Sequence, residues 1–515
     1  MRNILINNKN KIKFKDLSVV TSKIINKYPN ISRVAMEYLH PRNTHPQSLK
    51  IYKHTFKSYN KYYSFFINLI KSLAILILAI YRNEKMYFGD KMPQKIDILF
   101  ISHLTNIEQL KNSNEDNYFG EIINILSNGS YLVPFVTLIN HTWLTENVVK
   151  KIWVKSKFGK IVLSRTNNLF SELKYIVMLL RESKNIRDII CLKERKRNII
   201  NHACCNALSP SSIMALRTYF QVRKIIKKIK PQYLVTTYEG HSWERLVFHA
   251  AKQENINIKC IGFQHSILFP NQYSIFRIIK GYFNPDIILT PGKISYEWFA
   301  NKNISKFCTI KIIGTPRKLI IKKSLKNNLH QNAILVIPEG IKSETYFLFS
   351  AVINIARKLN KRSFILRVHP LLNIENFQKI FLKKGVLPSN IEWSSHSFEY
   401  DLLRSSVAIY RGSSSIISAC LNGLYPIYYS KLDDFESIDP LFLINKDERT
   451  AFSENDLINK IIAFENINIA DKNKIILGLK KYCSNYFEPF SYNNFLKILK
   501  LDNQKFKKVI YDKKC

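Results

Sequence analysis

The chain has 515 residues, and its length and composition exclude a small binding module, a disordered chain and a fibrous repeat. Hydrophobic residues make up 46% of the sequence and aromatic residues 12%, which is enough apolar material for two or three domains. Lys and Arg number 79 against 38 Asp and Glu, so the formal net charge is +41. This surplus fits an anionic membrane, a polyanionic substrate or nucleic acid as partner, but a codon bias toward Lys, Asn and Ile produces the same surplus.

The eight cysteines are scattered and form no CxxC pair, so neither a disulfide framework nor a zinc ribbon is indicated. That distribution is typical of a reducing compartment. Residues 1–15 are largely polar and basic and lack the apolar core of a signal peptide. We therefore expect a cytoplasmic protein.

Residues 1–94 are predicted to form an N-terminal extension that carries one long apolar helix at 62–81. Asn68 and Lys71 interrupt its apolar run, aromatic residues cluster at both ends, and basic residues flank it. This arrangement is typical of a helix that lies in the headgroup region, on the inner face of the cytoplasmic membrane. The alternatives are a helix buried against the following domain and a single membrane span.

From Lys95 onward, short β-rich runs alternate with longer helical stretches, which predicts parallel α/β units. The first series of runs comprises 96–102, 131–138, 160–163, 233–238, 258–263, 286–289 and 309–313. The second series comprises 333–338, 363–368, 391–393, 407–410 and 425–429. We expect two Rossmann-like doubly wound domains that face a cleft, at 95–320 and 321–475, followed by a basic helical tail at 476–515.

Ligands of such sheets bind beyond the carboxyl ends of the strands, and polar residues follow several of the runs directly. In the first predicted domain these residues are Glu239, Gly240, His241, Gln264 and His265. In the second they are Glu339, His369, Pro370, Gly412, Ser413, Ser414 and Ser415. The sequence therefore predicts one site in the cleft between the two domains.

The residues of the second domain suit the binding of a phosphorylated donor. Ser413, Ser414 and Ser415 stand where a strand turns into a helix, so their hydroxyls and free N–H groups can hold phosphate; an N-cap without a ligand is the alternative. Pro370 fixes the loop behind His369, whose imidazole would donate to a phosphate oxygen and stabilise a leaving nucleotide, unless it only packs there. Glu339 suits ribose or base groups, or is a solvated turn carboxylate.

Glu239 is the candidate general base, because it stands at a strand end where a carboxylate can accept the proton of an acceptor hydroxyl. The alternative is a carboxylate that only caps the next helix. His241 is a candidate partner of Glu239, and Gln264 and His265 are candidates for acceptor binding. Glu244, one helical turn further along, is typical of a helix N-terminal charge.

The Glu239-Gly240 pair, followed in the second domain by His369-Pro370 and Ser413-Ser414, resembles bacterial sialyltransferases and capsule Kdo transferases, which are GT-B enzymes using CMP-activated sugars. The strings at 238–245 and 262–266 are also similar to bacterial O-antigen or capsule biosynthesis proteins. The resemblance covers about residues 95–452. It implies Glu239 as base, His369 and the serines as phosphate ligands, and no metal or cofactor. Tyr238 departs from the pattern, which has an acidic residue there.

The first hypothesis is an inverting, metal-independent glycosyltransferase that moves a sugar from a nucleotide, as a CMP-activated nonulosonate or Kdo-type donor, to a surface polysaccharide or lipid-linked acceptor. Alternatives with the same two-domain architecture are a CDP-polyol phosphotransferase and a UDP-sugar epimerase. A nucleic-acid-binding protein is a third hypothesis, but the cations are spread along the chain and no RNP, KH or zinc-finger pattern occurs. We therefore expect no nucleic-acid partner.

Overall fold

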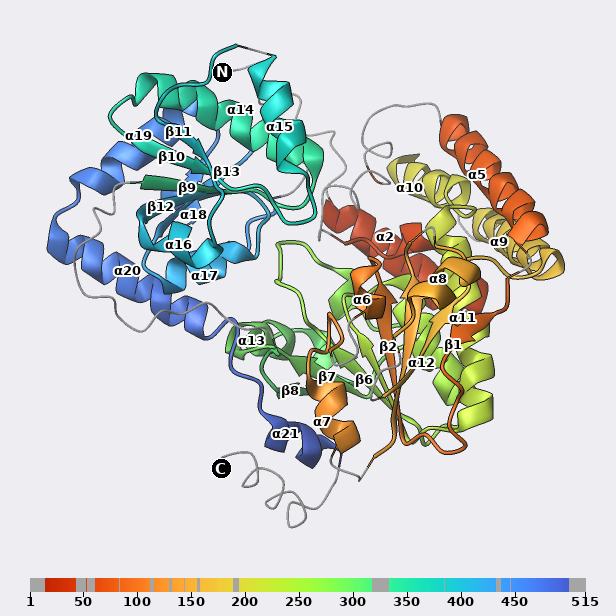
Figure 1. The fold of residues 1–515 in the computed structure, drawn as a ribbon. Coiled ribbons are helices and arrows are strands. Elements are labelled where there is room, and N and C mark those ends of the chain that lie inside the picture. Colours follow the sequence, from red (N-terminus) through yellow and green to blue (C-terminus); the bar gives the residue numbers. More distant parts are fainter. Residues whose placement is uncertain are drawn as a thin grey trace.

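The computed structural model describes residues 14–42, 52, 61–82, 84–111, 115–128, 132–142, 144–154, 158–188, 194–316, 333–383, 385–431, 437–444 and 446–499. Within these ranges the chain forms two α/β units, each built around one sheet (Figure 1). The boundary predicted between residues 320 and 321 and the part of the predicted tail after residue 499 lie outside the described residues.

The first sheet has eight strands in the order β1-β4-β3-β2-β5-β6-β7-β8. All its neighbours are parallel except β1, which pairs antiparallel with β4. The strands are β1 (Tyr87–Gly89), β2 (Ile98–Leu104), β3 (Pro134–Asn140), β4 (Gly159–Leu163), β5 (Tyr233–Thr237), β6 (Lys259–Phe263), β7 (Ile287–Thr290) and β8 (Thr309–Ile312).

The second sheet has six parallel strands in the order β11-β10-β9-β12-β13-β14. They are β9 (Ala333–Ile337), β10 (Ser363–Leu366), β11 (Ile391–Trp393), β12 (Ser405–Tyr410), β13 (Tyr425–Tyr429) and β14 (Thr450–Ala451). In chain order this is the 3-2-1-4-5-6 arrangement of a Rossmann domain, and the first sheet has the same arrangement from β4 to β7. The prediction of two Rossmann-like doubly wound domains is confirmed.

Helices cover both faces of the sheets. Those of the first unit are α2 (Phe14–Lys27), α3 (Ile31–Ala35), α5 (Lys61–Arg82), α6 (Glu108–Lys111), α7 (Ile122–Asn128), α8 (Glu146–Ile152), α9 (Leu169–Asp188), α10 (Glu194–Cys205), α11 (Pro210–Ile229), α12 (Ser242–Glu254) and α13 (Lys293–Ala300), with 3-10 turns η1 (Glu37–Leu39), η2 (Ser274–Phe276) and η3 (Asn303–Lys306). Those that follow are α14 (Lys342–Lys358), α15 (Ile374–Leu382), α16 (Phe398–Leu403), α17 (Ser415–Leu421), α18 (Lys446–Arg449), α19 (Glu454–Asn466), α20 (Ile469–Ser484) and α21 (Tyr492–Ile498).

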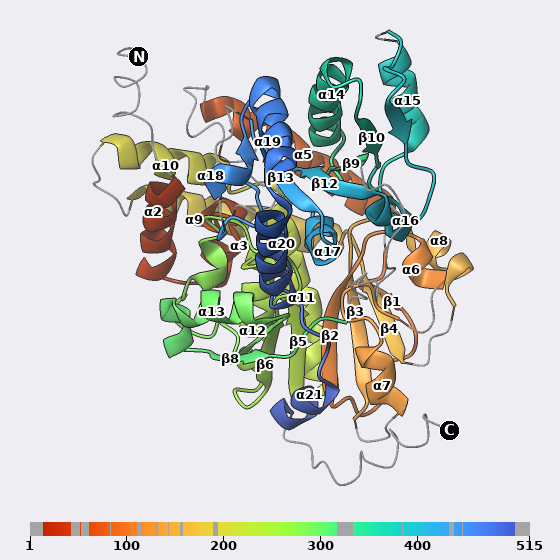
Figure 2. The same cartoon turned by 90° about the vertical axis from the view of Figure 1, so that its left-hand side faces the viewer.

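Both ends of the described chain pack on the first unit. Phe14 and Leu17 of α2 are buried in the same core as α11 and α12, so the described part of the predicted N-terminal extension is integral to this unit. At the other end, the chain descends from α20 to α21 (Figure 2), where Phe495 and Leu496 pack against Ile98 of β2. The chain thus passes between the two units a second time, when it returns from α20 of the second unit to α21 on the first.

Helix α5 corresponds to the apolar helix predicted at 62–81, and it lies along α9 and α10 at the outside of the first unit (Figure 1). Its polar residues face inward: Asn68 Nδ2 donates to Asn206 Oδ1 at 3.2 Å, and Ser72 Oγ donates to the Leu208 carbonyl at 3.2 Å. Its exposed residues form an apolar stripe at helical spacing, consisting of Tyr63, Phe66, Ile70, Leu73, Ile77, Ile80 and Tyr81. The helix is long and apolar enough to cross a membrane, and only 17% of its apolar window is buried. One side of the helix therefore packs on the first unit and the other side is exposed, and contact with a membrane stays a prediction.

Candidate active site

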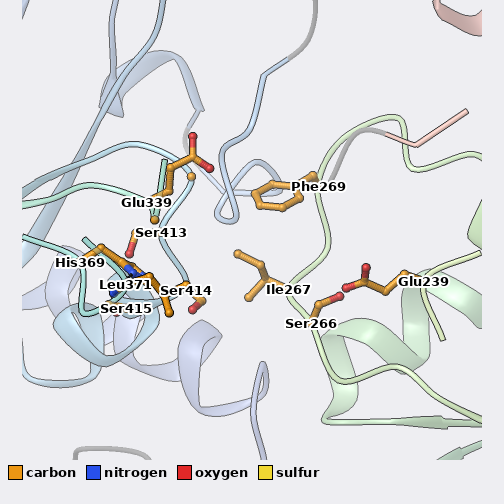
Figure 3. Close-up of a pocket in the computed structure, with 12 residues that line it drawn as sticks. Glu239, Ser266, Ile267, Phe269, Glu339, His369, Leu371, Ser413, Ser414 and Ser415 are labelled. Carbon is orange, nitrogen blue, oxygen red and sulfur yellow. Dashed lines mark hydrogen bonds between the residues drawn. The ribbon is translucent and has the colours of Figure 1, made fainter. Parts of the chain in front are cut away.

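The two sheets place their topological switch points at one cavity. In the first sheet the order in which strands are added reverses between the parallel strands β2 and β5, and Glu239 follows β5. In the second sheet it reverses between β9, which Glu339 follows, and β12, which Gly412 follows. These residues line a common cavity of about 300 Å³. The first unit contributes Glu239, Ser266, Ile267 and Phe269, and the second contributes Glu339, Gly340, His369, Leu371, Gly412, Ser413, Ser414 and Ser415. Figure 3 shows the two sets on opposite sides.

His369 has a defined tautomer on the second side of the cavity. The Leu371 N–H donates to its Nδ1 at 3.2 Å, so the proton of the neutral ring is on Nε2. Burial lowers the pKa of His369 below its ordinary value, which keeps the ring neutral at pH 7. Gly340 allows this placement, because a Cβ there would lie 3.0 Å from His369 Nδ1. The ring is therefore held as a donor of one hydrogen bond through Nε2.

The turn after β12 positions the serines. Arg411 is buried, and its Nε donates to Glu344 Oε2 at 2.6 Å, which anchors the turn to α14. Gly412 has φ +68°, and a Cβ there would meet Glu339 Oε2 at 2.9 Å. Only glycine thus combines this backbone with a carboxylate so close. The following residues, Ser413 to Ser415, lead into α17 and line the cavity as predicted.

Glu239 belongs to a hydrogen-bonded chain on the first side of the cavity. Arg42, just after η1, donates through Nη1 to His241 Nδ1. Because guanidinium only donates, the His241 proton is on Nε2, and this atom lies 3.1 Å from Glu239 Oε2. The second carboxylate oxygen, Oε1, lies 3.9 Å from His265 Nε2. The carboxylate is one-fifth exposed and faces the cavity. The Glu239 carboxylate is therefore held in one orientation and remains accessible from the cavity.

The neighbours of Glu239 have structural roles. Glu244 is fully buried and accepts the backbone N–H groups of Glu239, Gly240 and His241 at 2.8 to 3.0 Å, as expected of a residue that caps α12. Tyr238 points into the core and donates to the Ile275 carbonyl at 2.9 Å. Gly240 has φ +83°, and a Cβ there would lie 2.5 Å from the Ile275 nitrogen. The strand end is thus fixed so that only the Glu239 side chain reaches the cavity.

Like Gly240 and His241, three further predicted residues lie beside the cavity and do not line it. Gln264 is buried and donates to the Ser266 carbonyl. His265 packs edge-on against Tyr118, with 5.0 Å between ring centroids. Pro370 is exposed next to His369. Gln264 therefore shapes the Ser266 loop and does not line the cavity.

Two histidines without a predicted role lie at the same edge of the first sheet as Glu239. His103 is the penultimate residue of β2, and His141 comes directly after β3. His103 Nδ1 lies 2.8 Å from His141 Nε2, and its Nε2 lies 3.0 Å from Thr237 Oγ1. Burial, then the neighbouring histidines, lower the pKa of His103, and burial lowers that of His141 to about 4. The rule that selected Glu239 would have found both, whereas no local signal points to Arg42.

No family model and no curated protein matches the chain. Similar solved structures include the glycotransferase of kitacinnamycin, at 10% identity and a TM-score of 0.43, over 77% of this chain and 96% of that one. The UDP-GlcNAc 2-epimerase from Neisseria meningitidis has 12% identity and a TM-score of 0.42, over 78% and 98%. The α,α-trehalose-phosphate synthase from Burkholderia vietnamiensis has 9% identity and a TM-score of 0.42, over 79% and 98%. At such values these structures assign no activity to this chain.

Proposed function

We propose that the protein is an inverting glycosyltransferase that uses a nucleotide sugar as donor. One observation carries the proposal: an oriented carboxylate, Glu239, faces a neutral imidazole and three serines across one cavity between two Rossmann-like units. A carboxylate on one side and phosphate ligands on the other are what transfer from a nucleotide to a hydroxyl requires. A nucleotide sugar is a substrate here, and the reaction scheme below needs no cofactor.

In the proposed reaction the acceptor hydroxyl lies beside Glu239 and the donor phosphate beside His369. Glu239 takes the hydroxyl proton while the oxygen forms a bond to the anomeric carbon from the face opposite the nucleotide. The bond between that carbon and the phosphate oxygen breaks, and its electron pair stays on the phosphate. The Nε2–H of His369 and the hydroxyls of Ser413 and Ser414 stabilise this charge. Glu339 is placed to bind ribose or base groups.

For the donor we propose a CMP-activated nonulosonate or Kdo-type sugar, and for the acceptor a surface polysaccharide or a lipid-linked glycan. The order of Glu239-Gly240, His369-Pro370 and Ser413-Ser414 along the chain supports the donor class. Among the described residues that line the cavity, Glu339 is the one carboxylate of the second unit, so these residues offer no pair of carboxylates there to bind a metal ion. We propose that transfer is metal-independent.

We also propose that the protein attaches to the cytoplasmic membrane face through α5. Its outward apolar stripe supports this, together with the exposed cations Lys71 and Lys85 beside it, which suit anionic lipid. Sedimentation with vesicles of phosphatidylglycerol and phosphatidylethanolamine tests the attachment. Ile70→Glu should release the protein from the vesicles. Lys71→Gln replaces one polar residue by another and should weaken vesicle binding only slightly. Equal vesicle binding of Ile70→Glu and the wild type would refute the attachment through α5.

The test of the activity is a panel of CMP-, CDP-, UDP- and GDP-activated sugars with a glycan acceptor, scored for nucleotide release and for a new glycosidic product. The proposal predicts acceptor-dependent release of one nucleotide and a product with inverted anomeric configuration. Turnover with UDP-sugars alone would refute the CMP donor. An isomerised sugar formed without acceptor would identify the epimerase alternative, and transfer of a phosphoalcohol group would identify the phosphotransferase alternative.

A further inference from the structure

A second cavity, of about 190 Å³, lies between α5 and the carboxyl ends of β3 and β4 in the first unit. Its apolar wall includes Ile75 and Leu78 of α5. Its polar wall comes from the two strand ends and from α11, and consists of Asn140, His141, Ser164, Arg165, Thr166, Ser211, Arg217, Thr218 and Gln221. It lies on the same edge of the sheet as Glu239 but is lined by different residues from those of the candidate active site.

Three deeply buried polar atoms line this cavity without a hydrogen-bond partner in the described part of the chain: Asn140 Nδ2, Thr166 Oγ1 and Gln221 Oε1. Their residues are at most 7% exposed. The other amide atom of Asn140 and of Gln221 already has a partner, which fixes the orientation of both side chains. Asn140 Oδ1 accepts the Thr142 N–H at 2.9 Å, and Gln221 Nε2 donates to Asn167 Oδ1 at 2.7 Å. A buried polar atom without a partner costs free energy, so these three atoms indicate a ligand with hydrogen-bonding groups.

The charges around the cavity select an anion. Among the described residues that line it, the charged ones are Arg82, Arg165 and Arg217. Two carboxylates lie behind them: Glu172 accepts two hydrogen bonds of 2.6 Å from Arg217, and Glu84 lies 3.6 Å from Arg82 and also acts on Arg165, so the cluster keeps one net positive charge. Arg165 also donates to the Thr142 carbonyl at 2.7 Å. The first turn of α11, a 20-residue helix without an acidic residue in that turn, also borders the cavity through Ser211. Its N-terminus adds partial positive charge.

The position of the cavity indicates a ligand that is also apolar. One wall is the inner side of α5, and the opposite side of that helix carries the exposed apolar stripe. On the sheet side, His141 borders the cavity and contacts His103, which contacts Thr237, two residues before Glu239. Neighbouring strands are about 4.8 Å apart, so the ends of β3 and β5, two strands apart in the sheet, are separated by about 10 Å.

We propose that this cavity binds the phosphate group and the first part of the hydrocarbon chain of a lipid-linked glycan acceptor. Arg165, Arg82 and Asn140 hold the phosphate, Gln221 accepts a hydrogen bond from a sugar hydroxyl, and Ile75 and Leu78 contact the hydrocarbon. The glycan then extends along the sheet edge toward Glu239. The identification of the ligand as the acceptor rests on the proposed transferase function, whereas binding of an alkyl phosphate in this cavity does not.

Isothermal titration of the full chain with n-octyl phosphate, below its micelle concentration, and with inorganic phosphate tests the cavity. Octyl phosphate should bind at least about tenfold more tightly, because its chain is removed from water. Leu78→Trp, which fills the cavity, and Arg165→Gln should each weaken octyl phosphate about tenfold or more. Matched controls are Ile77→Trp on the exposed side of α5 and Arg181→Gln on the surface of α9, which should stay within about twofold.

Equal affinity for octyl phosphate and inorganic phosphate would overturn the proposal, and so would wild-type affinity in both Leu78→Trp and Arg165→Gln. Thr166→Val, which keeps the side-chain shape and removes one hydroxyl, serves if a larger change impairs folding, and it should weaken octyl phosphate about threefold. Titration with the donor nucleotide separates the two proposals. Loss of octyl phosphate binding with intact nucleotide binding refutes only the second cavity, and the reverse result refutes only the transferase site.

Discussion

The two sides of the candidate active site are built differently. On the second side, His369 and Ser413 to Ser415 are positioned mainly by nearby turns and by glycine, as Leu371, Gly340 and Gly412 show, and Arg411 adds one contact to Glu344 within the same unit. On the first side, Glu239 depends on Arg42, which comes from a segment about 200 residues earlier and reaches it through His241. A phosphate-binding side made from local turns is visible in sequence, whereas an oriented base requires tertiary contacts. The predictions below test whether the two sides have separate tasks.

The largest effect is expected from Glu239→Gln. The amide keeps the size of the side chain but cannot take the acceptor proton, so kcat should fall roughly 10³-fold with nucleotide affinity unchanged. Single-turnover kinetics and nucleotide titration measure the two quantities. Glu297→Gln, an exposed change on α13, is the control and should leave both unchanged. Turnover within tenfold of the wild type would remove Glu239 as the base.

His369→Ala should lower kcat about 10²-fold and weaken nucleotide binding as well, because the Nε2–H donor to the leaving phosphate is lost. The control is His396→Ala, an exposed histidine of the same unit. The decisive measurement is the nucleotide dissociation constant beside kcat. If His369→Ala lost turnover but bound nucleotide as the wild type does, the assignment of donor binding to the second side would fail.

His241→Ala tests the long-range support of Glu239 and should lower kcat about tenfold with little change in KM, because the substituted residue positions the base without touching the substrate. His241→Gln, which retains an N–H donor, should restore part of the activity. A changed KM, or no recovery in His241→Gln, would indicate a purely structural role.

Ser413→Ala and Ser414→Ala should each weaken nucleotide binding roughly ten- to a hundredfold, the effect of one hydrogen bond to a charged group. Ser418→Ala, further along α17, is the matched control because Ser418 does not line the cavity. The nucleotide dissociation constants of the three variants measure the contribution of each serine. Wild-type affinity in both cavity variants would leave His369 as the sole supported phosphate ligand.

Stability toward acid provides a smaller test on the first side. The pKa of His141 is about 4 in the folded protein and about 6.5 when unfolded, so between these values the unfolded chain binds more protons and stability falls as pH decreases. Because more than a third of the His141 surface is exposed, solvent screens the effect, and His141→Asn should flatten this dependence by about 1 kcal/mol or less of unfolding free energy between pH 7 and pH 4. Urea unfolding at several pH values measures it, and an unchanged slope would contradict a lowered pKa of His141.

The fold was predictable from sequence where strands are long and apolar, and less so at the sheet edges. β1 and β14, with three and two residues, went unrecognised, although the equally short edge strand β11 was predicted at 391–393. For α5, composition identified an apolar helix but not which side faces outward. That orientation follows from Asn68 and Ser72 finding partners near residues 206 and 208, which no local pattern specifies.

In the site, residues at strand ends were predictable because parallel strands bring their carboxyl ends together, and Glu239, Glu339, His369 and the serines do line one cavity. Gln264 follows the same rule but turns inward, since its amide completes the Ser266 loop. Arg42 was not predictable, because only the packing of the N-terminal segment against α12 brings it to His241.

The most direct test of the central claim is a crystal structure of the Glu239→Gln variant with the nucleotide sugar that binds most tightly. The account predicts a donor phosphate oxygen within hydrogen-bonding distance of His369 Nε2 and of a Ser413 or Ser414 hydroxyl, with the sugar directed toward residue 239. A nucleotide bound with its phosphates beside residue 239, or outside this cavity altogether, would contradict it.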